Sequence, residues 1–519
     1  MLFHEDEISG AEALARLSYG NPFLPERIAC EREVLGNAFA ETDLAWHKTA
    51  NEAVDRPNIP LLTAWSGRMA DTARARLEAG EAPAEDELPL YENLVFYYLY
   101  NKHEPELRRY ITACHDGRAP AKVDFYTAFA RDMERYLAPC AERLPALGET
   151  AHIFACFFQI RRAFHHVFDN IIGGSMASAR LRADVWQSIF TCDMARYRRG
   201  LFARMGDITT LITGPSGTGK ELVARAIGLS RYVPFDAQSL RFTEDFVHGF
   251  HPINLTAIAP TLIESELFGH VKGAFTGAIE DRAGLFETCP AHGTVFLDEL
   301  GELEPSLQVK LLRVLQTRSF QRVGESGSRR FDGKIVAATN RDMAEEMRER
   351  RFREDLYYRL CADVIVTPSL REQLAGAPEQ LRNLVRFTTQ RVAGPAEADA
   401  LTAEVVAYIE RHLGQDYPWP GNVRELEQCV RSVLVHRSYR PANMGQARGA
   451  ETWLDPLRAG TLSADEVLAC YITHVYAQTG SYQAAARRLG LDRRTVKARV
   501  DAELLRQYGK GSDHDADKK

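Results

Sequence analysis

The chain has 519 residues, 45% of them hydrophobic and 26% charged, which is the composition of a globular protein with room for roughly three domains. Its formal net charge of −7 excludes a surface that is basic throughout, so any contact with nucleic acid must depend on a local basic patch. No apolar run reaches the ~20 residues of a membrane helix, and the acidic start of the chain lacks the apolar core of a signal peptide. The sequence therefore predicts a cytoplasmic protein with no membrane partner.

The nine cysteines are scattered along the chain, with no Cys-x-x-Cys pair and no His/Cys cluster at the spacing of a zinc site. This pattern predicts free or buried thiols in a reducing compartment.

Residues 1–170 show helical periodicity and predict an all-α N-terminal domain. Apolar side chains recur at three- and four-residue spacing over residues 91–113, where Pro105 predicts an interruption, and over residues 123–137. In residues 153–172, phenylalanines alternate with arginines and histidines. That segment favours a bundle core with a basic face, and a ligand pocket, a haem-like site or a partner groove are the alternatives. Nothing here identifies a signal that the domain would sense.

A short apolar strand at residues 210–213 is followed by a glycine-rich loop, a lysine and a helical run, which is the order of a phosphate-binding loop. The glycines let backbone N–H groups turn toward phosphates, the helix N-terminus adds partial positive charge, and Lys220 adds a full charge. The residue after this lysine is Glu221, where the common motif has a hydroxyl that binds magnesium. The predicted ATP-binding loop comprises Gly214, Pro215, Ser216, Gly217, Thr218, Gly219, Lys220 and Glu221.

A second apolar strand ends in Asp298 and Glu299. The first carboxylate is suited to hold Mg²⁺, and the second to orient and deprotonate the water that attacks ATP. An Asp-Glu pair after a strand is usually only a turn, but the phosphate loop upstream favours the catalytic interpretation. The two segments together predict ATP and Mg²⁺ as cofactors, with Asp298 as the metal-binding carboxylate.

Other polar groups follow that could reach a γ-phosphate. A strand at residues 334–339 ends in Asn340, whose amide could report on loss of that phosphate. Arg353 and Arg359 are either solvated helix charges or suppliers of positive charge to the nucleotide of a neighbouring subunit. A Pro/Gly turn then opens a helix with Arg424 in its first turns, placed to reach back from a small helical lid.

Between the two nucleotide segments lies Gly-Ala-Phe-Thr-Gly-Ala, residues 273–278. Its glycines exclude an ordinary helix and hinge the segment. Phe275 and Thr276 stand at its centre, where a surface loop would normally carry polar residues. Taken alone, the segment is either a packed turn or a loop built to touch another molecule.

These motifs make residues 171–435 resemble the AAA+ domain of the bacterial enhancer-binding proteins, which activate sigma-54 RNA polymerase. In that family a Glu is usual after the phosphate-loop lysine, as Glu221 is here. The resemblance also rests on the specific segments 264–270, 273–278, 295–299, 338–341, 352–360 and 419–427.

The resemblance implies an α/β P-loop ATPase core, residues 171–365, followed by a helical lid, residues 366–435. It implies that Lys220, Asp298 and Glu299 serve ATP binding and hydrolysis. It further implies that Asn340 and Arg424 are the first and second sensors, that Arg353 and Arg359 are catalytic fingers across a hexamer interface, and that Asn254 restrains Glu299. The residues implied to contact sigma-54 are Gly273, Ala274, Phe275, Thr276, Gly277 and Ala278.

Three departures from the family pattern stand out. Pro215 replaces the usual Glu, and the lid entry at residues 368–373 is a weakened form. Residues 236–251 form an insertion, which could be an exposed loop near the nucleotide or an element between subunits. None of these changes removes a catalytic group.

Residues 436–460 are rich in Pro, Gly, Ala and Arg and predict a linker, and residues 509–519 predict a disordered tail. Between them, residues 461–508 predict three helices in a helix-turn-helix pattern, the third capped by Asp492. Residues 480–496 resemble the Fis-type module that ends most enhancer-binding proteins and binds double-stranded DNA as a dimer. The recognition-helix residues nearest DNA would be Arg493, Arg494, Thr495 and Lys497.

The sequence thus predicts a hexameric ATPase, dimeric when inactive, that binds an upstream enhancer and remodels the closed complex of sigma-54 RNA polymerase holoenzyme. The alternative is a DNA-binding regulator whose ATPase domain mainly controls oligomerisation. Relatives of that kind typically lack the intact Phe-Thr pair of the loop, so the intact pair favours the motor. A small-molecule kinase is disfavoured because it needs neither paired arginine fingers nor a helix-turn-helix.

Overall fold

The computed structural model describes residues 2–41, 56–375, 377, 379–414, 416–441, 457, 460–501 and 504–505. The chain divides into two compact units, residues 1–434 and residues 435–519. Within the described ranges, no helix combines the length and the apolar character that crossing a membrane requires. All nine cysteines are free, as predicted.

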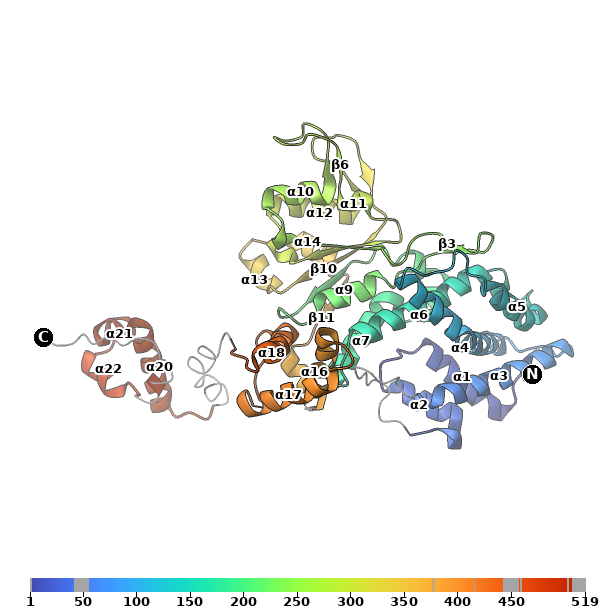
Figure 1. The fold of residues 1–519 in the computed structure, drawn as a ribbon, viewed down its shortest axis with the longest axis horizontal. Coiled ribbons are helices and arrows are strands. Elements are labelled where there is room, and N and C mark those ends of the chain that lie inside the picture. Colours follow the sequence, from blue (N-terminus) through green and yellow to red (C-terminus); the bar gives the residue numbers. More distant parts are fainter. Residues whose placement is uncertain are drawn as a thin grey trace. The chain divides into compact units, whose positions relative to one another are not determined.

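The N-terminal region of the first unit is helical, as predicted (Figure 1). The expected interruption at Pro105 is wrong, because one long helix runs through this proline. A proline removes a single helical hydrogen bond, while buried side chains on both sides of it, Leu99 and Leu107, hold the helix against its neighbours. The helices are α1 (Glu5–Tyr19), α2 (Glu26–Leu35), α3 (Asn58–Glu78), α4 (Glu87–His115), α5 (Tyr126–Leu137) and α6 (Thr150–Asn170), with short 3-10 turns at Gly36–Ala38, Ala138–Cys140 and Pro145–Leu147.

The insertion at residues 236–251 packs on this helical region through its aromatic side chains, while most of its other residues are exposed. It follows strand β2 (Phe235–Asp236), which pairs with β3 (Arg241–Phe242) in a small antiparallel hairpin. Phe242 stacks on Phe158 of α6 at 4.2 Å between ring centroids, and Phe246 meets the same ring edge-on at 4.9 Å. Aromatic burial therefore fixes the insertion as an arm that joins the two regions.

A five-stranded parallel sheet forms the centre of the following region, in the order β11-β1-β10-β7-β4. Strand β10 is buried at every position, which is the pattern of a strand covered on both faces. Alternate residues serve the two faces. Val336 and Ala338 pack toward helices α7 and α9, and Ile335 and Ala337 pack toward α10, α12 and α14. The strands are β1 (Thr210–Thr213), β4 (Phe250–Asn254), β7 (Thr294–Asp298), β10 (Lys334–Thr339) and β11 (Asp363–Val366).

Helices cover both faces of the sheet, and two small hairpins extend from it (Figure 1). The helices of this region are α7 (Met176–Phe190), α8 (Met194–Arg199), α9 (Lys220–Gly228), α10 (Pro260–Phe268), α11 (Leu285–Thr288), α12 (Pro305–Thr317), α13 (Met343–Arg348) and α14 (Glu354–Leu360), with 3-10 turns at Leu201–Ala203, Leu255–Ala257 and Leu300–Glu302. The hairpins pair β5 (Gly269–His270) with β6 (Arg282–Ala283), and β8 (Ser319–Phe320) with β9 (Arg329–Arg330). The lid contains α15 (Leu370–Leu374), α16 (Glu379–Ala393), α17 (Ala398–His412) and α18 (Asn422–His436).

Helix α6 contributes to two separate hydrophobic clusters, one on each side of the predicted domain boundary at residue 170. Its first half, including Phe154 and Phe158, packs among the N-terminal helices. Its second half, including Ala163 and Val167, packs with α7 and α9 against the sheet. The two regions are thus held together by one rigid helix.

The second unit contains three helices, α20 (Ala464–Thr479), α21 (Tyr482–Leu489) and α22 (Arg493–Arg499). They enclose a small core that includes Ile472, Val475 and Val496. Asp492 caps α22 as predicted, because its carboxylate accepts a hydrogen bond from the backbone N–H of Arg494 at 2.8 Å. Most of the predicted linker and the whole predicted tail lie outside the described residues.

Candidate nucleotide site and surface loop

The predicted nucleotide motifs meet at the carboxyl edge of the parallel sheet. Strand β1 ends at Thr213 before the glycine-rich loop, β7 ends at Asp298, and β10 ends at Thr339 before Asn340. In open α/β sheets, ligands bind outside this edge. Three segments that are far apart in sequence therefore form one candidate site.

The glycine-rich loop needs its glycines. Gly214, Gly217 and Gly219 have φ angles of 143°, 78° and 91°, which side chains disfavour. Space is also lacking, since a Cβ at Gly214 would lie 2.7 Å from the carbonyl oxygen of Thr367. The ammonium of Lys220 donates to the carbonyl oxygens of Gly214 and Pro215 at 3.0 and 3.2 Å, so the loop curves around this charge.

Burial lowers the pKa of Lys220, and the nearby carboxylates of Glu299 and Asp298 act in the opposite direction. The cation and both predicted catalytic carboxylates are therefore close enough to interact. Glu299 has a φ of 55°, a left-handed conformation that a bulky residue keeps only when its surroundings impose it. Its backbone N–H donates to the Asp298 carboxylate at 3.0 Å.

Two amides contact the carboxylate pair. The Asn340 side chain donates to Glu299 with 3.5 Å between Nδ2 and Oε1. The Asn254 side chain donates to Asp298 at 3.0 Å, although the resemblance implied that it restrains Glu299. The strand register explains the difference, because Asn254 of β4 lies directly opposite Asp298 of β7.

The lid reaches the glycine-rich loop through the first turn of α18. Arg424, which was expected to reach the nucleotide from the lid, donates to the hydroxyl of Ser216 at 3.1 Å. Asn422, which sequence reasoning missed, donates to the backbone carbonyl of Ser216 at 2.9 Å and accepts from the backbone N–H of Leu370 at 2.8 Å. Its place directly after Gly421 in the Pro/Gly turn was the available signal.

The remaining loop residues have defined partners. The Thr218 hydroxyl donates to the Pro215 carbonyl at 2.8 Å and lies 2.6 Å from the Thr367 hydroxyl. Glu221 is exposed on α9, 3.7 Å from Arg225. Its carboxylate thus contacts the helix surface rather than Lys220.

The two candidate arginine fingers flank helix α14. Arg353 is its N-cap and forms a two-pronged ion pair with Asp355 at 2.7 and 3.0 Å. Arg359 stands in its last turn. Both side chains are exposed, so a second molecule could reach them.

The loop at residues 273–278 closes on itself at the end of the β5–β6 hairpin. The Gly273 N–H donates to the Ala278 carbonyl at 2.9 Å, and the Ala278 N–H donates to the Phe275 carbonyl at 3.0 Å. Phe275 is nevertheless 39% exposed, with its ring edge against His270. The loop is therefore a structured turn that presents an apolar tip.

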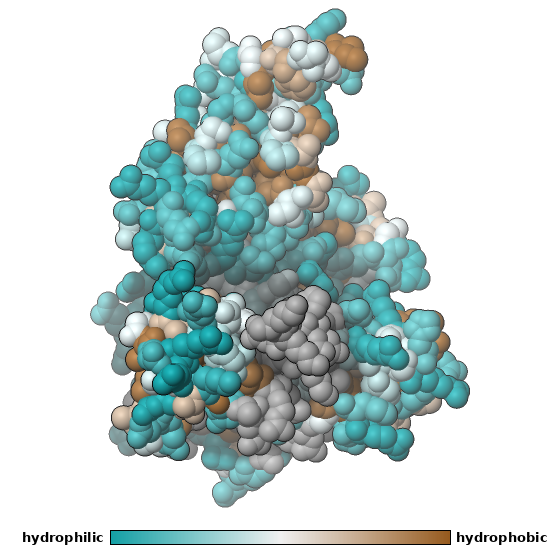
Figure 2. Space-filling view, turned by 90° about the vertical axis from the view of Figure 1, so that its left-hand side faces the viewer, coloured by the Kyte–Doolittle hydropathy of each residue, from teal (hydrophilic) through white to brown (hydrophobic). Residues whose placement is uncertain are grey.

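Ile279, directly after this loop, is 81% exposed and was missed by sequence reasoning. Figure 2 shows hydrophobic surface at the top of the molecule, where Figure 1 places the β5–β6 hairpin. An isoleucine next to a glycine-hinged turn gave a weak signal. Ile279 and the neighbouring Phe275 together form an exposed hydrophobic patch, and such patches are suited to contact another protein.

The β8–β9 hairpin supports the base of the loop. The Val271 N–H donates to the Val323 carbonyl at 3.1 Å, and the Val323 N–H donates to the Gly269 carbonyl at 2.9 Å. Gly324 packs so closely that an added Cβ would lie 2.8 Å from the Cβ of Ala274. The two hairpins thus form one projecting structure.

In the second unit, the four residues predicted to lie nearest DNA are on one helix. Val496 of α22 is buried in the small core. The four residues are exposed, namely Arg493, Arg494, Thr495 and Lys497.

Comparison with known proteins agrees with the motifs. Residues 196–366 match the family model described as the Sigma-54 interaction domain. The Nif-specific regulatory protein of Azotobacter vinelandii is 41% identical over 300 residues, covering 56% of this chain and 53% of the relative. The anaerobic nitric oxide reductase transcription regulator NorR of Klebsiella pneumoniae is 44% identical over 257 residues, covering 48% of this chain and 43% of the relative. The chain thus spans about half the length of these curated relatives.

Among solved structures, NtrX from Brucella abortus aligns over 70% of this chain and 76% of that chain. The identity is 24% and the TM-score is 0.38, a level at which no residue correspondence is drawn.

Proposed function

We propose that this chain, whose residues 196–366 match the sigma-54 interaction domain, is an ATP-driven transcription activator. It would bind upstream DNA and remodel the closed complex of sigma-54 RNA polymerase so that the promoter opens. The observation that carries the proposal is the loop at residues 273–278, an apolar tip on a hairpin that extends from a candidate nucleotide-binding core.

The donor set at the sheet edge fits ATP with Mg²⁺. Lys220 would hold the β- and γ-phosphates, and the Asp298 carboxylate would hold Mg²⁺, which supplies charge stabilisation to the transferring phosphoryl group when bound. Glu299 would accept a proton from the attacking water. Its distance of 3.5 Å from the Asn340 amide lets that amide orient the carboxylate.

Nucleotide state would reach the rest of the chain through the contacts of the phosphate loop. The lid touches this loop through Asn422 and Arg424, so a change at the phosphates would move α18. On the sheet side, Asn254 links strand β4 to Asp298. We propose that these contacts act as the sensors and the switch, and that they set the position of the β5–β6 hairpin.

A ring of subunits would complete the site. Arg353 and Arg359 are exposed and lie on α14, so they would approach the γ-phosphate of a neighbouring subunit in a hexamer. The ion pair of Arg353 with Asp355 would then exchange for the nucleotide, and the dimer would be the inactive form.

The second unit would bind double-stranded DNA. The exposed basic residues of α22 suit the major groove, and the capped N-terminus of this helix would point at a phosphate or base edge. In titrations of duplex DNA, Arg494→Ala should weaken binding, and affinity should fall steeply as salt rises. Equal affinity in the variant and the parent would remove Arg494 from the DNA contact.

The alternative function is a DNA-binding regulator whose ATPase domain mainly controls oligomerisation. The exposed Phe275 tip favours the motor, because oligomerisation alone gives no reason to expose it. Permanganate footprinting of a sigma-54 promoter decides between them. The motor requires melting that depends on both the sigma-54 holoenzyme and hydrolysable ATP. Melting without ATP turnover, or regulation only of promoters read by other holoenzymes, would support the alternative.

A further inference from the structure

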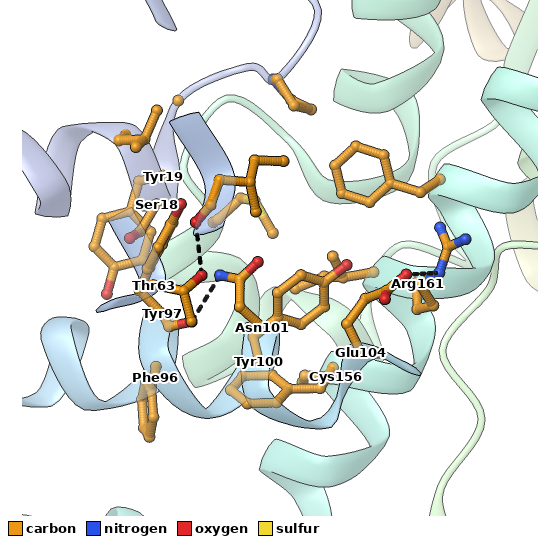
Figure 3. Close-up of a pocket in the computed structure, with 18 of the residues that line it drawn as sticks. Ser18, Tyr19, Thr63, Phe96, Tyr97, Tyr100, Asn101, Glu104, Cys156 and Arg161 are labelled. Carbon is orange, nitrogen blue, oxygen red and sulfur yellow. Dashed lines mark hydrogen bonds and ion pairs between the residues drawn. The ribbon is translucent and has the colours of Figure 1, made fainter. Parts of the chain in front are cut away.

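A cavity of about 1250 Å³ lies among helices α1, α2, α3, α4, α6, α7 and α8 of the first unit (Figure 3). Pockets for organic ligands commonly span about 300–1,000 Å³, so this one can take a molecule of several rings. Its walls are aromatic and include Phe96, Tyr100, Phe157, Phe164 and Trp186. Such walls favour a flat apolar body.

The segment at residues 153–172 contributes some phenylalanines to the N-terminal core and others to the lining of the cavity. Phe154 and Phe158 are in the N-terminal core, as the bundle interpretation expects. Phe157, Phe164 and Phe168 line the cavity, as the ligand-pocket alternative expects. Of the basic residues in this segment, Arg161 and His165 line the cavity, whereas Arg162 donates to the backbone carbonyl of Arg231.

The lining carries an excess of positive charge. Five arginines line the cavity, Arg27, Arg56, Arg108, Arg161 and Arg198, with Glu104 as the acidic residue.

Nearby carboxylates balance part of this charge. Glu31 pairs with Arg27 at 2.5 Å and Glu92 pairs with Arg198 at 2.6 Å, while Glu104 is shared between Arg161 at 2.9 Å and Arg108 at 3.6 Å. Among the described residues, five arginines against three carboxylates leave an excess of about two positive charges.

Arg56 is the cation of this set for which no ion pair with a described residue is found, although the Glu31 carboxylate lies near enough to act against the lowering of its pKa by burial. Within the described part of the chain, its guanidinium has no ion pair, and it lies over the ring of Phe168 at 4.7 Å. Burial, with Arg27 as the next cause, lowers the pKa of Arg56 to about 9. A buried, unbalanced cation is costly unless a partner compensates it.

We propose that this cavity binds an organic anion with an aromatic body, its charge facing Arg56 and its rings lying between the aromatic walls. Polar side chains around the middle of the cavity, such as Thr63 and Asn101, offer hydrogen bonds to substituents of such a ligand (Figure 3). A planar guanidinium suits a carboxylate or sulfonate, because it can donate two parallel hydrogen bonds.

The cavity is connected to the nucleotide site by packing. Trp186 and Phe190 of α7 line the cavity and also pack with Val223 and Ile227 of α9, the helix that follows the phosphate loop. A bound ligand would therefore touch side chains that support this helix. Any effect on ATP turnover rests on the proposed function, whereas ligand binding itself does not.

The binding test uses the full chain and two fluorescent probes. Anilinonaphthalene sulfonate is an aromatic anion, and phenylnaphthylamine has the same rings without the charge. The sulfonate should saturate one site, and Arg56→Gln should weaken it about tenfold, the effect of losing one charged hydrogen bond. The affinity for the neutral probe should change by less than about twofold in Arg56→Gln. The matched control is Arg68→Gln, an exposed arginine outside the cavity, which should leave both probes unaffected.

Energy transfer from Trp186 to the sulfonate locates the bound probe, since this indole lines the cavity. Trp186→Phe should lower the efficiency of energy transfer, with Trp65 beside the lining residue Ala64 supplying the remainder. Ile160→Trp should fill the space and block binding. Circular dichroism of each variant checks that the helices are retained. Equal sulfonate affinity in the parent and Arg56→Gln overturns the proposal, as does energy transfer of equal efficiency in the parent and Trp186→Phe. These measurements use neither ATP nor polymerase, so their failure would leave the proposed activator function untouched.

Discussion

Phe242, on the hairpin of the insertion, stacks on Phe158 of helix α6 with 4.2 Å between ring centroids. Nearby, the Val123 N–H donates to the Leu240 carbonyl at 2.9 Å. The insertion runs directly into strand β4 (Phe250–Asn254), which ends at Asn254. The insertion therefore contacts the N-terminal helices and continues along the chain into the strand that reaches the candidate nucleotide site. We infer that it couples the two regions.

Phe242→Ala should weaken the packing of the insertion on helix α6. Phe242 is half-buried, so the loss should be about 1–2 kcal/mol, below the 3–5 kcal/mol of a fully buried phenylalanine. Urea unfolding gives the stability, and hydrogen exchange of α6 shows where it is lost. Phe275→Ala, which removes an exposed ring from a different hairpin, is the control and should leave both unchanged. Equal effects of the two variants would contradict the coupling role.

Thr276→Ala should separate ATP hydrolysis from promoter opening. Thr276 is exposed on the loop and far from the carboxylate pair in sequence, so turnover should stay within about twofold. Opening of a sigma-54 promoter should be abolished, because the loop is the proposed contact. Thr243→Ala, an exposed threonine in the insertion, should retain both activities. Normal opening by the Thr276→Ala variant would show that the loop role is wrong.

Glu299→Gln should bind ATP and hydrolyse it at least about a hundredfold more slowly, the usual effect of losing a general base. Binding should persist because Lys220 and the glycine-rich loop are unchanged. A fluorescent ATP analogue measures affinity, and phosphate release measures turnover. Glu304→Gln, an exposed glutamate close by in sequence, is the matched control. Turnover at the normal rate in the Glu299→Gln variant would reject the catalytic assignment.

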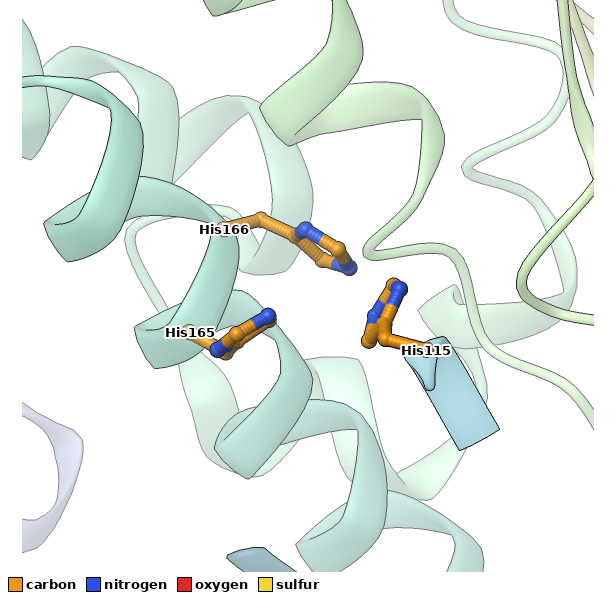
Figure 4. A group of neighbouring side chains, drawn as sticks. All are labelled: His115, His165 and His166. Carbon is orange, nitrogen blue, oxygen red and sulfur yellow. The ribbon is translucent and has the colours of Figure 1, made fainter. Parts of the chain in front are cut away.

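Three histidines that are far apart in sequence meet beside helix α6. His115 ends α4 and faces His165 and His166 of α6, with one ring nitrogen of each within 4.8 Å of the others (Figure 4). His166 is buried, and its Nε2 has no hydrogen-bond partner among the described residues. Burial, with the nearby His165 and Arg162, holds the pKa of His166 well below its ordinary value. A proton on His166 is therefore disfavoured in the folded chain, which links the stability of this region to pH.

The sign of that response follows from proton binding. Below about pH 6.5 an unfolded His166 takes up a proton that the folded chain excludes. As the pH is lowered through this range, the free energy of unfolding therefore decreases by up to about 1.4 kcal/mol per pH unit. Above that pH, His166 is neutral in both the folded and the unfolded chain, so it does not change the free energy of unfolding. Urea unfolding of the full chain should therefore show a weaker acid loss in His166→Gln than in the parent. His436→Gln, an exposed histidine, should match the parent. If the free energy of unfolding of the parent and of both variants changed with pH in parallel, His166 would not be the source of the acid loss of stability.

Much of the candidate site could be predicted from the sequence because its chemistry depends on short, contiguous segments. The phosphate loop needs glycines at the positions where φ is positive, and the strand before Asp298 and Glu299 needs an unbroken apolar run. Lys220 and Asn340 follow such segments directly. The sequence alone therefore determined the sheet-edge chemistry and the helical character of both ends of the chain.

Contacts between distant segments were decided only by the tertiary structure. Asn254 contacts Asp298 because strand register, which no local pattern encodes, sets them opposite each other. The insertion turned out to be an arm on the N-terminal helices because the partner of Phe242 lies more than eighty residues away, at Phe158. The cavity beside Arg56 likewise depends on how seven helices leave a space unfilled. Periodicity in the sequence shows that aromatic side chains are buried, but only packing decides whether they fill a core or surround a hollow.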